Sequence, residues 1–427
     1  MPAPLRENTP TLTLQHTEES TTAPQITLTP SETKLFDLLV GATEYVRRTY
    51  PEAAPITLRV AGGWVRDKLL GLDSSDIDIA IDTMTGEPFA KALKAYMLEL
   101  PQSSSGAQSD MVMSSIATIQ VNPEKSKHLE TATAKVMGLM IDFVHLRTEK
   151  YGTDSRNPVV DFGTPLEDAL RRDITINALF YNLHTRQIED FTNEGLPDLR
   201  IGLIRTPLPP LQTFIDDPLR VLRVIRFATR FQYSIHPDIV SAVARPEIRE
   251  SFVRKITRER IGVEVDKMMR HERAVEAMEW IREFGFWGEV FGVTGVVVPP
   301  KVKLFEDEEG SVRLERLDGE MGVLASRIAR SIIKDDSGTL FPQADLLPTN
   351  SEARRALYLS CAALPLHGLK YRNKDKLYPL ARFIILDGLK FSSKDADTAT
   401  YLSYAIDHTR DMVHDLKSRG WQCDRKE

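Results

Sequence analysis

The sequence has little cysteine, no long apolar run and no excess of positive charge. Only Cys361 and Cys423 occur among its 427 residues, so a disulfide framework is excluded and a reducing compartment is expected. The chain contains no stretch of about 18 apolar residues, which argues against a transmembrane helix and a membrane partner. A formal net charge of −6 argues against a globally basic nucleic-acid-binding protein, but it is compatible with a local basic groove.

The length and the hydrophobic fraction of 42% allow a large core divided among several modules. Residues 1–30 are rich in Thr, Pro and Ser and are expected to form a disordered tail. Arg6 is the only basic residue in this tail, which also contains three glutamates. A mitochondrial targeting segment is typically Arg-rich and poor in acids, so the composition gives such a segment little support.

Residues from about 31 to 195 show a mixed α and β pattern, and helical patterns follow. Apolar spacing and alternation predict helices at 34–50 and 89–100, strands at 56–61, 76–82, 114–121 and 135–147, and a hairpin at 179–191. After about residue 195 no further strands are expected. The predicted fold is therefore an α+β head, made of a small mixed sheet with helices, followed by an all-α neck, body and tail.

Two acidic residues lie in the alternating segment "DIDIAID", which is predicted to be a strand. Residues i and i+2 of a strand face the same side, so Asp76 and Asp78 point together while Ile77, Ile79 and Ile81 point to the core. Paired carboxylates on a rigid surface suit a divalent, oxygen-ligated cation such as Mg²⁺. The alternative is an edge strand with solvated acids. An EF-hand is disfavoured because its glycine and distant glutamate are missing.

A glycine turn precedes these carboxylates, between a predicted strand and a short predicted helix. Backbone amides at Gly62 and Gly63 can approach a phosphate at the helix N-terminus. Arg66 follows one helical turn later, where it either contacts phosphate or pairs with an acid. The turn and the two carboxylates together indicate a metal-dependent phosphate-transfer site.

A third carboxylate and a second basic motif extend this hypothesis. Asp142 lies in "LMIDFVHLR", a strand setting like that of Asp78, as either a metal ligand or the base that takes a proton from a hydroxyl. In "RRDITINALF" the arginines can contact phosphate, and Asp173 can accept a hydrogen bond from a ribose hydroxyl. Asn177 follows one turn later. The alternative for this motif is a helix N-terminus capped by Asp173.

The segment "DDPLRVLRVIRF" places Asp217 three residues before Arg220, so an acceptor and a donor can face one way. Cytosine and adenine both present an amino donor beside a ring-nitrogen acceptor, whereas uracil and guanine do not. The pair can therefore select C and A without a template. The alternative is that Asp217 caps a helix with Pro218 at its first position.

Four arginines at helical spacing form a basic stripe on this segment: Arg220, Arg223, Arg226 and Arg230. Arg223 and Arg226 are candidate contacts for phosphate or RNA, and the alternative is a solvated face bridged to acids. In "TRERIGVEVDKM", Arg260 and Glu264 are one helical turn apart. We expect an ion-paired helix there that braces the base-reading helix.

Four motifs occur in a fixed order: "GGWVRDKLLG…DIDIAID", "RRDITINALFYNL", "DDPLRVLRVIRF" and "ERIGVEVDKM". Together they resemble the class II tRNA nucleotidyltransferases, the CCA-adding enzymes, eukaryotic-like members of the DNA polymerase β nucleotidyltransferase superfamily. The resemblance is strong over about 56–290. Each motif would be weak alone, but their order makes the assignment specific.

The resemblance implies template-independent addition of C, C and A to the 3′ end of tRNA from CTP and ATP, with Mg²⁺ in a two-metal transfer that releases pyrophosphate. It assigns Arg172 to the triphosphate, Asp173 to the ribose, and Asp217 and Arg220 to the base. Asp216 would orient Arg220, although bacterial members usually have Glu there. It also likens 146–165 to the family's mobile loop, whereas the alternative is an ordinary connection.

The resemblance also suggests how the chain is divided into segments and where in the cell it works. The expected segments are a disordered tail at 1–30, a nucleotidyltransferase head at 31–193, a base-recognising neck at 194–270, a body with an irregular insert at 271–345 and a tRNA-binding tail at 346–427. A monomer is expected, in the cytoplasm with nuclear and mitochondrial pools. The rivals are a poly(A) polymerase, a CC- or A-adding enzyme, and a non-catalytic RNA-binding protein.

Overall fold

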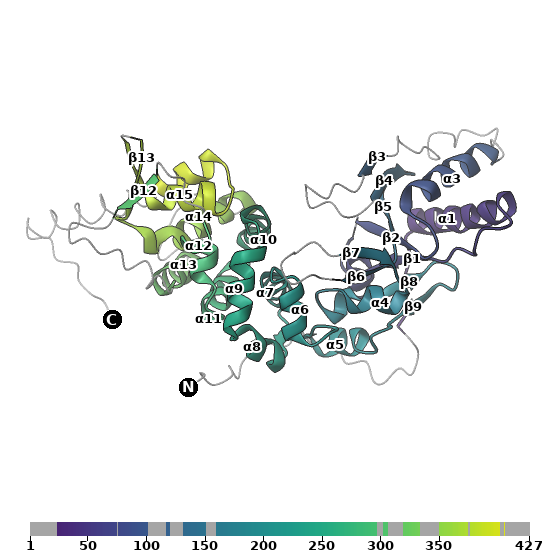
Figure 1. The fold of residues 1–427 in the computed structure, drawn as a ribbon, viewed down its shortest axis with the longest axis horizontal. Coiled ribbons are helices and arrows are strands. Elements are labelled where there is room, and N and C mark those ends of the chain that lie inside the picture. Colours follow the sequence, from purple (N-terminus) through teal and green to yellow (C-terminus); the bar gives the residue numbers. More distant parts are fainter. Residues whose placement is uncertain are drawn as a thin grey trace, which may run out of the picture. The chain divides into compact units, whose positions relative to one another are not determined.

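The computed structural model describes residues 24–74, 76–100, 117–119, 131–150, 159–296, 302–305, 319–333, 350–374, 376–401 and 405 (Figure 1). The chain divides into two compact units, Met1–Asp216 with Gln232–Ile239 and Asp217–Phe231 with Val240–Glu427. Most of the predicted tail at 1–30 lies outside the described residues, and the segment boundaries expected at 193, 270 and 345 stay predictions. Within the described part, no helix has the length and apolar character needed to cross a membrane.

The first unit is built on a seven-stranded mixed sheet with the order β3-β4-β5-β2-β1-β8-β9. Strands β2 and β5 run parallel, and the other neighbouring pairs are antiparallel. This is the mixed sheet that the sequence predicts. Its strands are β1 (Leu58–Ala61), β2 (Ile77–Ile81), β3 (Ala117–Ile119), β4 (Thr131–Val136), β5 (Leu139–His145), β8 (Phe180–Asn182) and β9 (Gln187–Glu189).

One face of this sheet is covered by helix α3 (Gly86–Glu99), which contacts β4 and β5, and α1 (Pro30–Thr49) packs on α3. Phe89 of α3 meets Phe143 of β5 edge to face, with ring centroids 5.6 Å apart. Ile79 is opposite Phe143 in the β2–β5 register and is fully buried. Because side chains alternate along a strand, Asp78 and Asp142 emerge on the other face.

The segment between β7 (Val159–Phe162) and β8 packs on the other face of the sheet. Helix α4 (Pro165–Leu170) begins with a capping box in which Thr164 and Glu167 bond to each other's backbone N–H groups. A 3₁₀ turn (Thr175–Asn177) follows, and Ala169 and Ala178 pack with Ala80 of β2 and Phe180 of β8 in one buried cluster. This packing brings the segment 168–178 onto the face that carries the carboxylates.

Helix α2 (Gly63–Leu69) begins at the glycine turn and anchors itself through Trp64, which is 1% exposed. The indole Nε1 donates to Glu32 of α1 at 3.2 Å, and the ring meets Phe36 edge to face. Lys68 of α2 also bonds Glu32 at 2.8 Å. The first turn after the glycines is therefore fixed to α1.

Two sequence predictions in this unit are corrected. The single strand expected at 135–147 is the end of β4 and all of β5, joined by a turn in which Met137 and Gly138 have positive φ. The segment 146–165, interpreted as an aperiodic loop, contains the antiparallel strands β6 (Arg147–Lys150) and β7 (Val159–Phe162), while 151–158 lie outside the described residues. The hairpin expected at 179–191 is confirmed as β8 and β9.

Short elements complete the first unit. They are α5 (Gly195–Ile201), β10 (Leu203–Ile204), α6 (Pro210–Asp216), β11 (Ser234–Ile235) and the start of α8 (Pro237–Val243). Strands β10 and β11 pair in parallel. The expectation that strands stop after about residue 195 is therefore wrong here.

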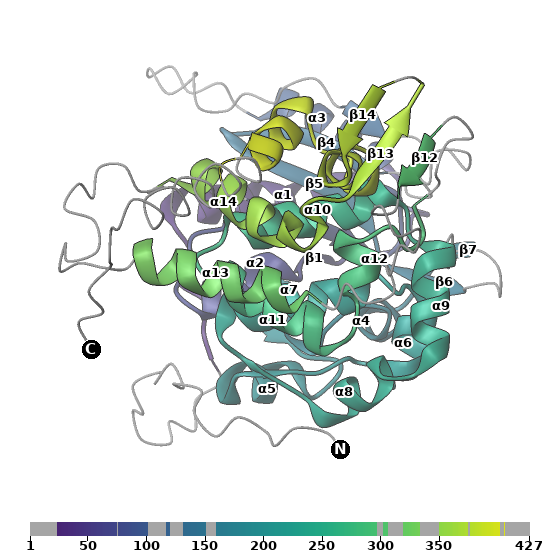
Figure 2. The ribbon, with the colours of Figure 1, turned by 90° about the vertical axis from the view of Figure 1, so that its left-hand side faces the viewer.

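The second unit is mostly helical, as expected. Its helices are α7 (Arg220–Phe231), α9 (Pro246–Lys255), α10 (Arg258–Arg270), α11 (Ala274–Glu283), α12 (Trp287–Phe291), α13 (Glu320–Ile333), α14 (Ser351–Ala363) and α15 (Leu380–Phe383). Alpha-helix α15 continues directly into a π-helical turn (Ile384–Gly388). The expected all-α character needs correction, because this unit also contains a three-stranded antiparallel sheet. Its strands are β12 (Val302–Phe305), β13 (Lys370–Asn373) and β14 (Lys376–Pro379), which lie side by side in Figure 2.

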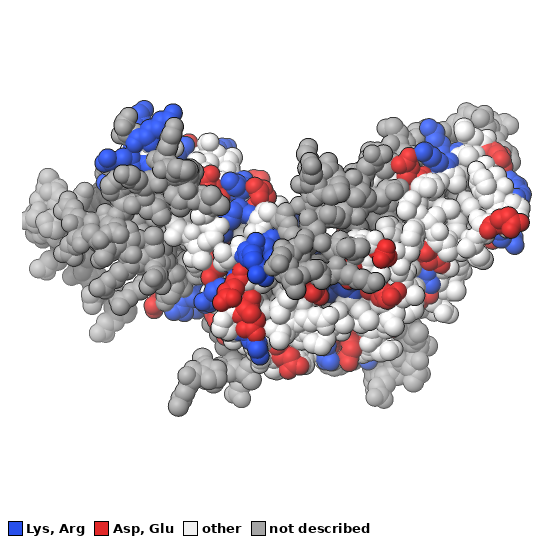
Figure 3. Space-filling model, in the orientation of Figure 1, with Lys and Arg blue, Asp and Glu red and all other residues white. Residues whose placement is uncertain are grey.

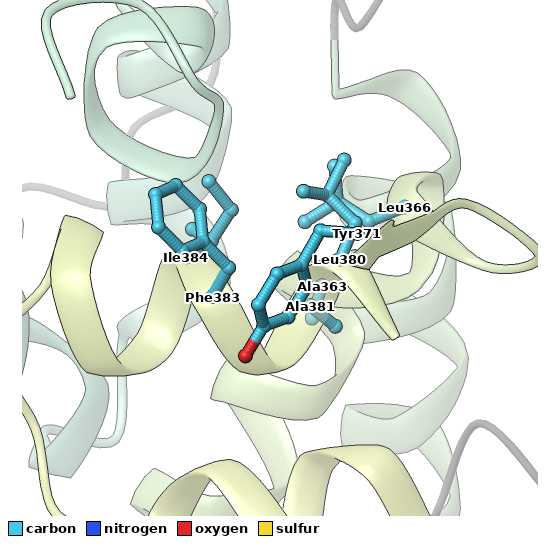
Figure 4. Packing of buried hydrophobic residues seen from close by; sticks show 7 residues of the cluster. All are labelled: Ala363, Leu366, Tyr371, Leu380, Ala381, Phe383 and Ile384. Carbon is cyan, nitrogen blue, oxygen red and sulfur yellow. The ribbon is translucent and has the colours of Figure 1, made fainter. Parts of the chain in front are cut away.

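This small sheet rests on its own apolar cluster. Tyr371 of β13 packs against Phe383 of α15 with centroids 5.4 Å apart, and both belong to the seven buried residues of Figure 4. The outer side of the hairpin is basic, and Figure 3 shows blue side chains gathered over it. The exposed cations there are Lys370, Arg372, Lys374 and Lys376.

The close approach of α3 to β5 gives a first prediction. A Cβ on Gly86 would overlap the carbonyl of Phe143, and the backbone on both sides has little room to move. We expect Gly86→Ala to lower the free energy of unfolding by about 1–3 kcal/mol, measured by urea denaturation. The control is Lys91→Ala on the same helix, which breaks one exposed ion pair and is expected to cost under about 1 kcal/mol. Equal stabilities for the two variants would contradict the packing described.

Candidate active site

Three carboxylates meet on the open face of the sheet. Asp78 of β2 is opposite Asp142 of β5 in the parallel register, and Asp76 lies just before β2. One oxygen from each of the three lies within 4.8 Å of the others. Thr133 of β4 donates its hydroxyl hydrogen to Asp142 at 2.5 Å. The structure thus brings together Asp76, Asp78 and Asp142, which the sequence had placed in two separate motifs.

The charge of Asp78 is poorly compensated. Burial, and after it the carboxylates of Asp76 and Asp142, raise its pKa to about 6, although Arg172 and Arg147 act in the opposite direction. Converging carboxylate oxygens are the donor set that Mg²⁺ prefers, and a bound cation would relieve this repulsion. The residues present therefore fit a divalent metal site.

A second group of predicted residues surrounds the glycine turn. Gly62 has φ of +71°, and a Cβ added there would lie 2.5 Å from Nη1 of Arg172. That nitrogen donates to the carbonyl of Asn177 at 3.1 Å, and the guanidinium lies over the Phe180 ring, 5.1 Å from its centroid. The absence of a side chain at Gly62 thus makes room for Arg172.

Asp173 and Asn177 form the next part of this group. Asn177 donates to Asp173 at 3.0 Å, and the same oxygen accepts the N–H of Ile174 at 3.0 Å. The alternative of a longer helix capped by Asp173 is not realised, because only the 3₁₀ turn follows. Both side chains are buried and held in fixed positions at the edge of the carboxylate face.

Arg66 is bonded to neighbouring side chains of the first unit. Its side chain is 5% exposed and donates to Asp67 at 2.7–2.8 Å and to Oδ1 of Asn177. It thus realises the alternative of pairing with an acid, and it fixes the amide of Asn177. Gly63, the first residue of α2, lies beside it.

Sequence reasoning missed Asp168, which is 1% exposed. Its carboxylate receives hydrogen bonds from Arg171 and Arg172 at 2.5–3.2 Å, and these two arginines hold its pKa down to about 2 despite burial. The signal in the sequence is the spacing of three and four residues between the acid and the two arginines. On a helix that spacing puts all three side chains on one side.

The predicted base-reading residues lie in the second unit. Asp217 accepts a bidentate pair from Arg260 of α10 at 2.6 and 3.2 Å, and it also accepts the N–H of Leu219 at 3.3 Å. The capping alternative is realised only in part, because Asp217 accepts one backbone N–H while α7 begins at Arg220 and not at Pro218. Arg220 is the first residue of α7 and is buried. Asp216 ends α6 in the first unit and is partly buried.

Helix α10 braces α7 through ion pairs, as expected from the sequence. Glu264 accepts from Arg226 at 2.5 Å and lies 3.8 Å from Arg223. Arg226 also lies over the Phe227 ring, 4.1 Å from its centroid. Two members of the basic stripe are thus bridged to an acid, while Arg230 is exposed.

Parts of the predicted insert and tail lie outside the described residues: 306–318, 334–349, 402–404 and 406–427, which include Cys423. Cys361 is buried, and burial raises its pKa to about 12, so it has no thiolate character at neutral pH.

Comparison with known proteins identifies the family of the chain. Residues 58–205 match the family of poly A polymerase head domains. The chain is 39% identical over 368 residues to a tRNA nucleotidyltransferase of Schizosaccharomyces pombe, covering 86% of this chain and 68% of that protein. It is 52% identical over 261 residues to the mitochondrial CCA tRNA nucleotidyltransferase of Saccharomyces cerevisiae, covering 61% and 47%. The chain belongs to the tRNA nucleotidyltransferase family.

The fold is also that of solved structures. A crystal structure of a tRNA nucleotidyltransferase complexed with a primer tRNA and an incoming ATP analog aligns with a TM-score of 0.58 at 20% identity, covering 87% of this chain and 86% of that one. At this identity the likeness is one of fold. The chain covers about half the length of the Saccharomyces relative and of a Candida glabrata relative, 47% and 46%.

The repulsion at Asp78 gives a second prediction. Its folded pKa is about 6 and its ordinary value is 3.8, so the ionised form costs stability above about pH 6 and the cost disappears as the pH falls to about 4. We expect Asp78→Asn to raise the free energy of unfolding of the metal-free protein by about 1–3 kcal/mol at pH 7.5, with no gain at pH 4.

Thermal unfolding in EDTA and in MgCl₂ checks this prediction. Mg²⁺ should raise the melting temperature of wild type. In EDTA, Asp78→Asn should melt at a higher temperature than wild type, and Mg²⁺ should change its melting temperature little. The control is Asp73→Asn, an exposed acid of the preceding loop, which should behave as wild type in both buffers. A destabilised Asp78→Asn protein at pH 7.5 would refute the repulsion.

Proposed function

We propose that this chain adds C, C and A to the 3′ end of tRNA, from CTP and ATP, with release of pyrophosphate. The observation that carries the proposal is the convergence of Asp76, Asp78 and Asp142 on one sheet face, beside Arg172 and the glycine turn. Membership of the tRNA nucleotidyltransferase family supports the choice of substrate. The name of the Saccharomyces relative supports CCA addition in particular.

The carboxylates are the ligands that we propose for Mg²⁺. Bound Mg²⁺ would act as a Lewis acid on the RNA 3′-hydroxyl and on the phosphate oxygens. Asp76 and Asp78 would hold the metal, and Asp142, fixed by Thr133, would hold metal or take the proton of the hydroxyl. The sheet sets these positions before substrate arrives, so the protein contributes orientation and electrostatics.

The nucleotide would be held by the group around the glycine turn. Arg172 would bind the triphosphate together with the backbone amide of Gly63, and Asp173 would accept from the ribose. Gly62 would contribute the space of the turn, since its own N–H donates to the carbonyl of Leu179 at 2.9 Å. Asn177 would keep Asp173 oriented, since it donates to that carboxylate at 3.0 Å. Arg66 stays a proposed contact for phosphate, and its bond to Asn177 would also help to hold Asp173.

Asp217 and Arg220 would select the base, with Asp216 orienting Arg220. Oδ1 of Asp217 accepts from Arg260 and from the N–H of Leu219, whereas Oδ2 accepts from Arg260. A carboxylate oxygen accepts two hydrogen bonds, so Oδ2 has acceptor capacity for an amino group. Arg223 and Arg226 remain proposed contacts for phosphate or RNA. Arg226 would have to make such a contact while it stays paired with Glu264.

The cellular location is proposed from the names of the relatives. The Saccharomyces and Candida relatives are named mitochondrial, which supports a mitochondrial pool of this protein, and cytoplasmic and nuclear pools complete the proposal. A monomer is proposed as the working form. The basic β13–β14 hairpin supports contact of the residues after 346 with tRNA.

The test uses tRNA that ends before CCA, with Mg²⁺ and labelled CTP or ATP, separately and together. We expect two C and one A, then a stop, and we expect Asp76→Ala/Asp78→Ala to lose at least about 10³-fold in rate because it lacks the metal ligands. Asp73→Ala is the matched control and should keep full activity. Long A tails would indicate a poly(A) polymerase, and C alone or A alone a partial enzyme.

A non-catalytic RNA-binding protein would give a different result. It would bind the tRNA in a mobility-shift assay and incorporate no nucleotide at any Mg²⁺ concentration. That outcome with correctly folded protein would overturn the proposal.

Base selection gives a separate prediction. Arg220→Ala should lower kcat/KM for CTP and ATP by about 10- to 100-fold, because a charged donor to the ring nitrogen is lost. Discrimination against UTP and GTP should fall at the same time. Arg230→Ala on the exposed side of the same helix is the control and should keep the selectivity of wild type. Single-turnover incorporation of all four nucleotides measures both effects, and unchanged discrimination in Arg220→Ala would remove this role.

A further inference from the structure

We propose that Asp168 is a positioning residue for nucleotide binding, which it serves by holding the guanidinium of Arg172 toward the triphosphate. This inference rests on the proposed function, since it takes Arg172 as the triphosphate ligand. It adds a residue that no motif of the sequence had singled out.

The geometry divides the Asp168 carboxylate between two arginines. Oδ2 accepts from Nη2 of Arg172 at 2.9 Å and from its Nε at 3.2 Å. Oδ1 accepts from Arg171 at 2.5 and 2.9 Å and from the backbone N–H of Arg147 at 3.3 Å. Asp168, which is 1% exposed, therefore accepts charge-assisted hydrogen bonds on both oxygens. Such hydrogen bonds are stronger than those between neutral groups.

Arg172 is fixed on its remaining sides as well. Gly62 leaves space for Nη1, the carbonyl of Asn177 accepts from that nitrogen, and the Phe180 ring lies against the guanidinium plane. Among the described residues, these acceptors use three of its five N–H groups. Two N–H groups remain for a ligand, and Asp168 determines which way they point.

The position of this charge matters for the reacting centre. Arg172 lowers the pKa of Asp78 and so lies within electrostatic reach of the carboxylates that would hold Mg²⁺. A nucleotide triphosphate carries its negative charge to the same place. Asp168 thus sets where a compensating cation is held before the nucleotide arrives, which reduces the cost of ordering a long side chain on binding.

The same cluster contains a natural control. Glu149 of β6 accepts from Arg171 at 3.1 Å and from Arg147 at 2.7 Å, and no bond to Arg172 is described for it. Removing its charge disturbs the buried cluster and leaves the Asp168–Arg172 bonds intact. A comparison of Asp168→Asn with Glu149→Gln therefore separates an effect on Arg172 from a general loss of packing.

The experiment measures binding of ATP and of AMP by titration calorimetry with Mg²⁺, in the full chain without tRNA. We expect Asp168→Asn to weaken ATP binding by about 10- to 100-fold and AMP binding by less than about twofold, because AMP lacks the outer phosphates. Glu149→Gln should leave both affinities within about twofold of wild type. In steady-state assays the same variant of Asp168 should raise KM for CTP and ATP by one common factor.

A double-mutant cycle decides whether the effect passes through Arg172. In an Arg172→Ala background, Asp168→Asn should cause no further loss of ATP affinity. Additive losses, equal losses of ATP and AMP, or an Asp168→Asn protein that binds ATP as wild type does would each overturn the proposal.

Stability is measured alongside, because Asp168→Asn leaves two arginines in a buried place. If that variant does not fold, Asp168→Glu keeps the charge and moves it by one methylene. It should weaken ATP binding severalfold in the wild-type background and not at all with Arg172→Ala. Because binding is measured without tRNA, a wild type that adds no nucleotide would contradict the proposed function and leave this comparison intact.

Discussion

Repulsion among three carboxylates is the constraint on which the first unit depends. The parallel pairing of β2 and β5 forces Asp78 and Asp142 side by side, and Asp76 adds a third charge. A sheet that carries such a face must receive cations from elsewhere in the chain. The segment 164–180 supplies them, since its capping box, its buried alanines and its 3₁₀ turn fix it on that face.

The second requirement follows from the first. A cation that offsets the carboxylate charges without forming ion pairs with them has to be held at a set distance from them. Arg172 is held in this way by Asp168, by Asn177 and by the Phe180 ring. Gly62 belongs to this arrangement because any side chain there would displace the guanidinium. The glycine turn therefore serves the arginine, whether or not its amides contact phosphate.

Local rules predicted a good part of this site from the sequence. The period of two placed Asp76 and Asp78 on one face, with the isoleucines buried behind them, because that rule needs only neighbouring residues. The register that sets Asp142 beside Asp78 depends on strand order across 60 residues, so the sequence could only name Asp142 as a candidate. Asp168 was missed because an acid three and four residues before arginines is also the common pattern of an exposed helix.

The remaining errors have similar physical causes. A turn through Met137 requires positive φ at a residue that seldom adopts it, so β4 and β5 read as one strand. Strands β13 and β14 alternate little and carry exposed lysines, which conceals a sheet whose apolar side is supplied mainly by Tyr371. The bracing of α7 by α10 was predictable, because acid and base recur there at helical spacing.

The indole beneath the glycine turn also has a practical consequence. Trp64 is the one tryptophan in the described part of the first unit, whereas Trp280 and Trp287 belong to the second. Its ring is buried against Phe36 and bonded to Glu32, so its fluorescence depends on the junction of α1 and α2. With the tryptophans of the second unit and Trp421 replaced by phenylalanine, the tryptophan fluorescence of this protein would report the folding of its first unit alone.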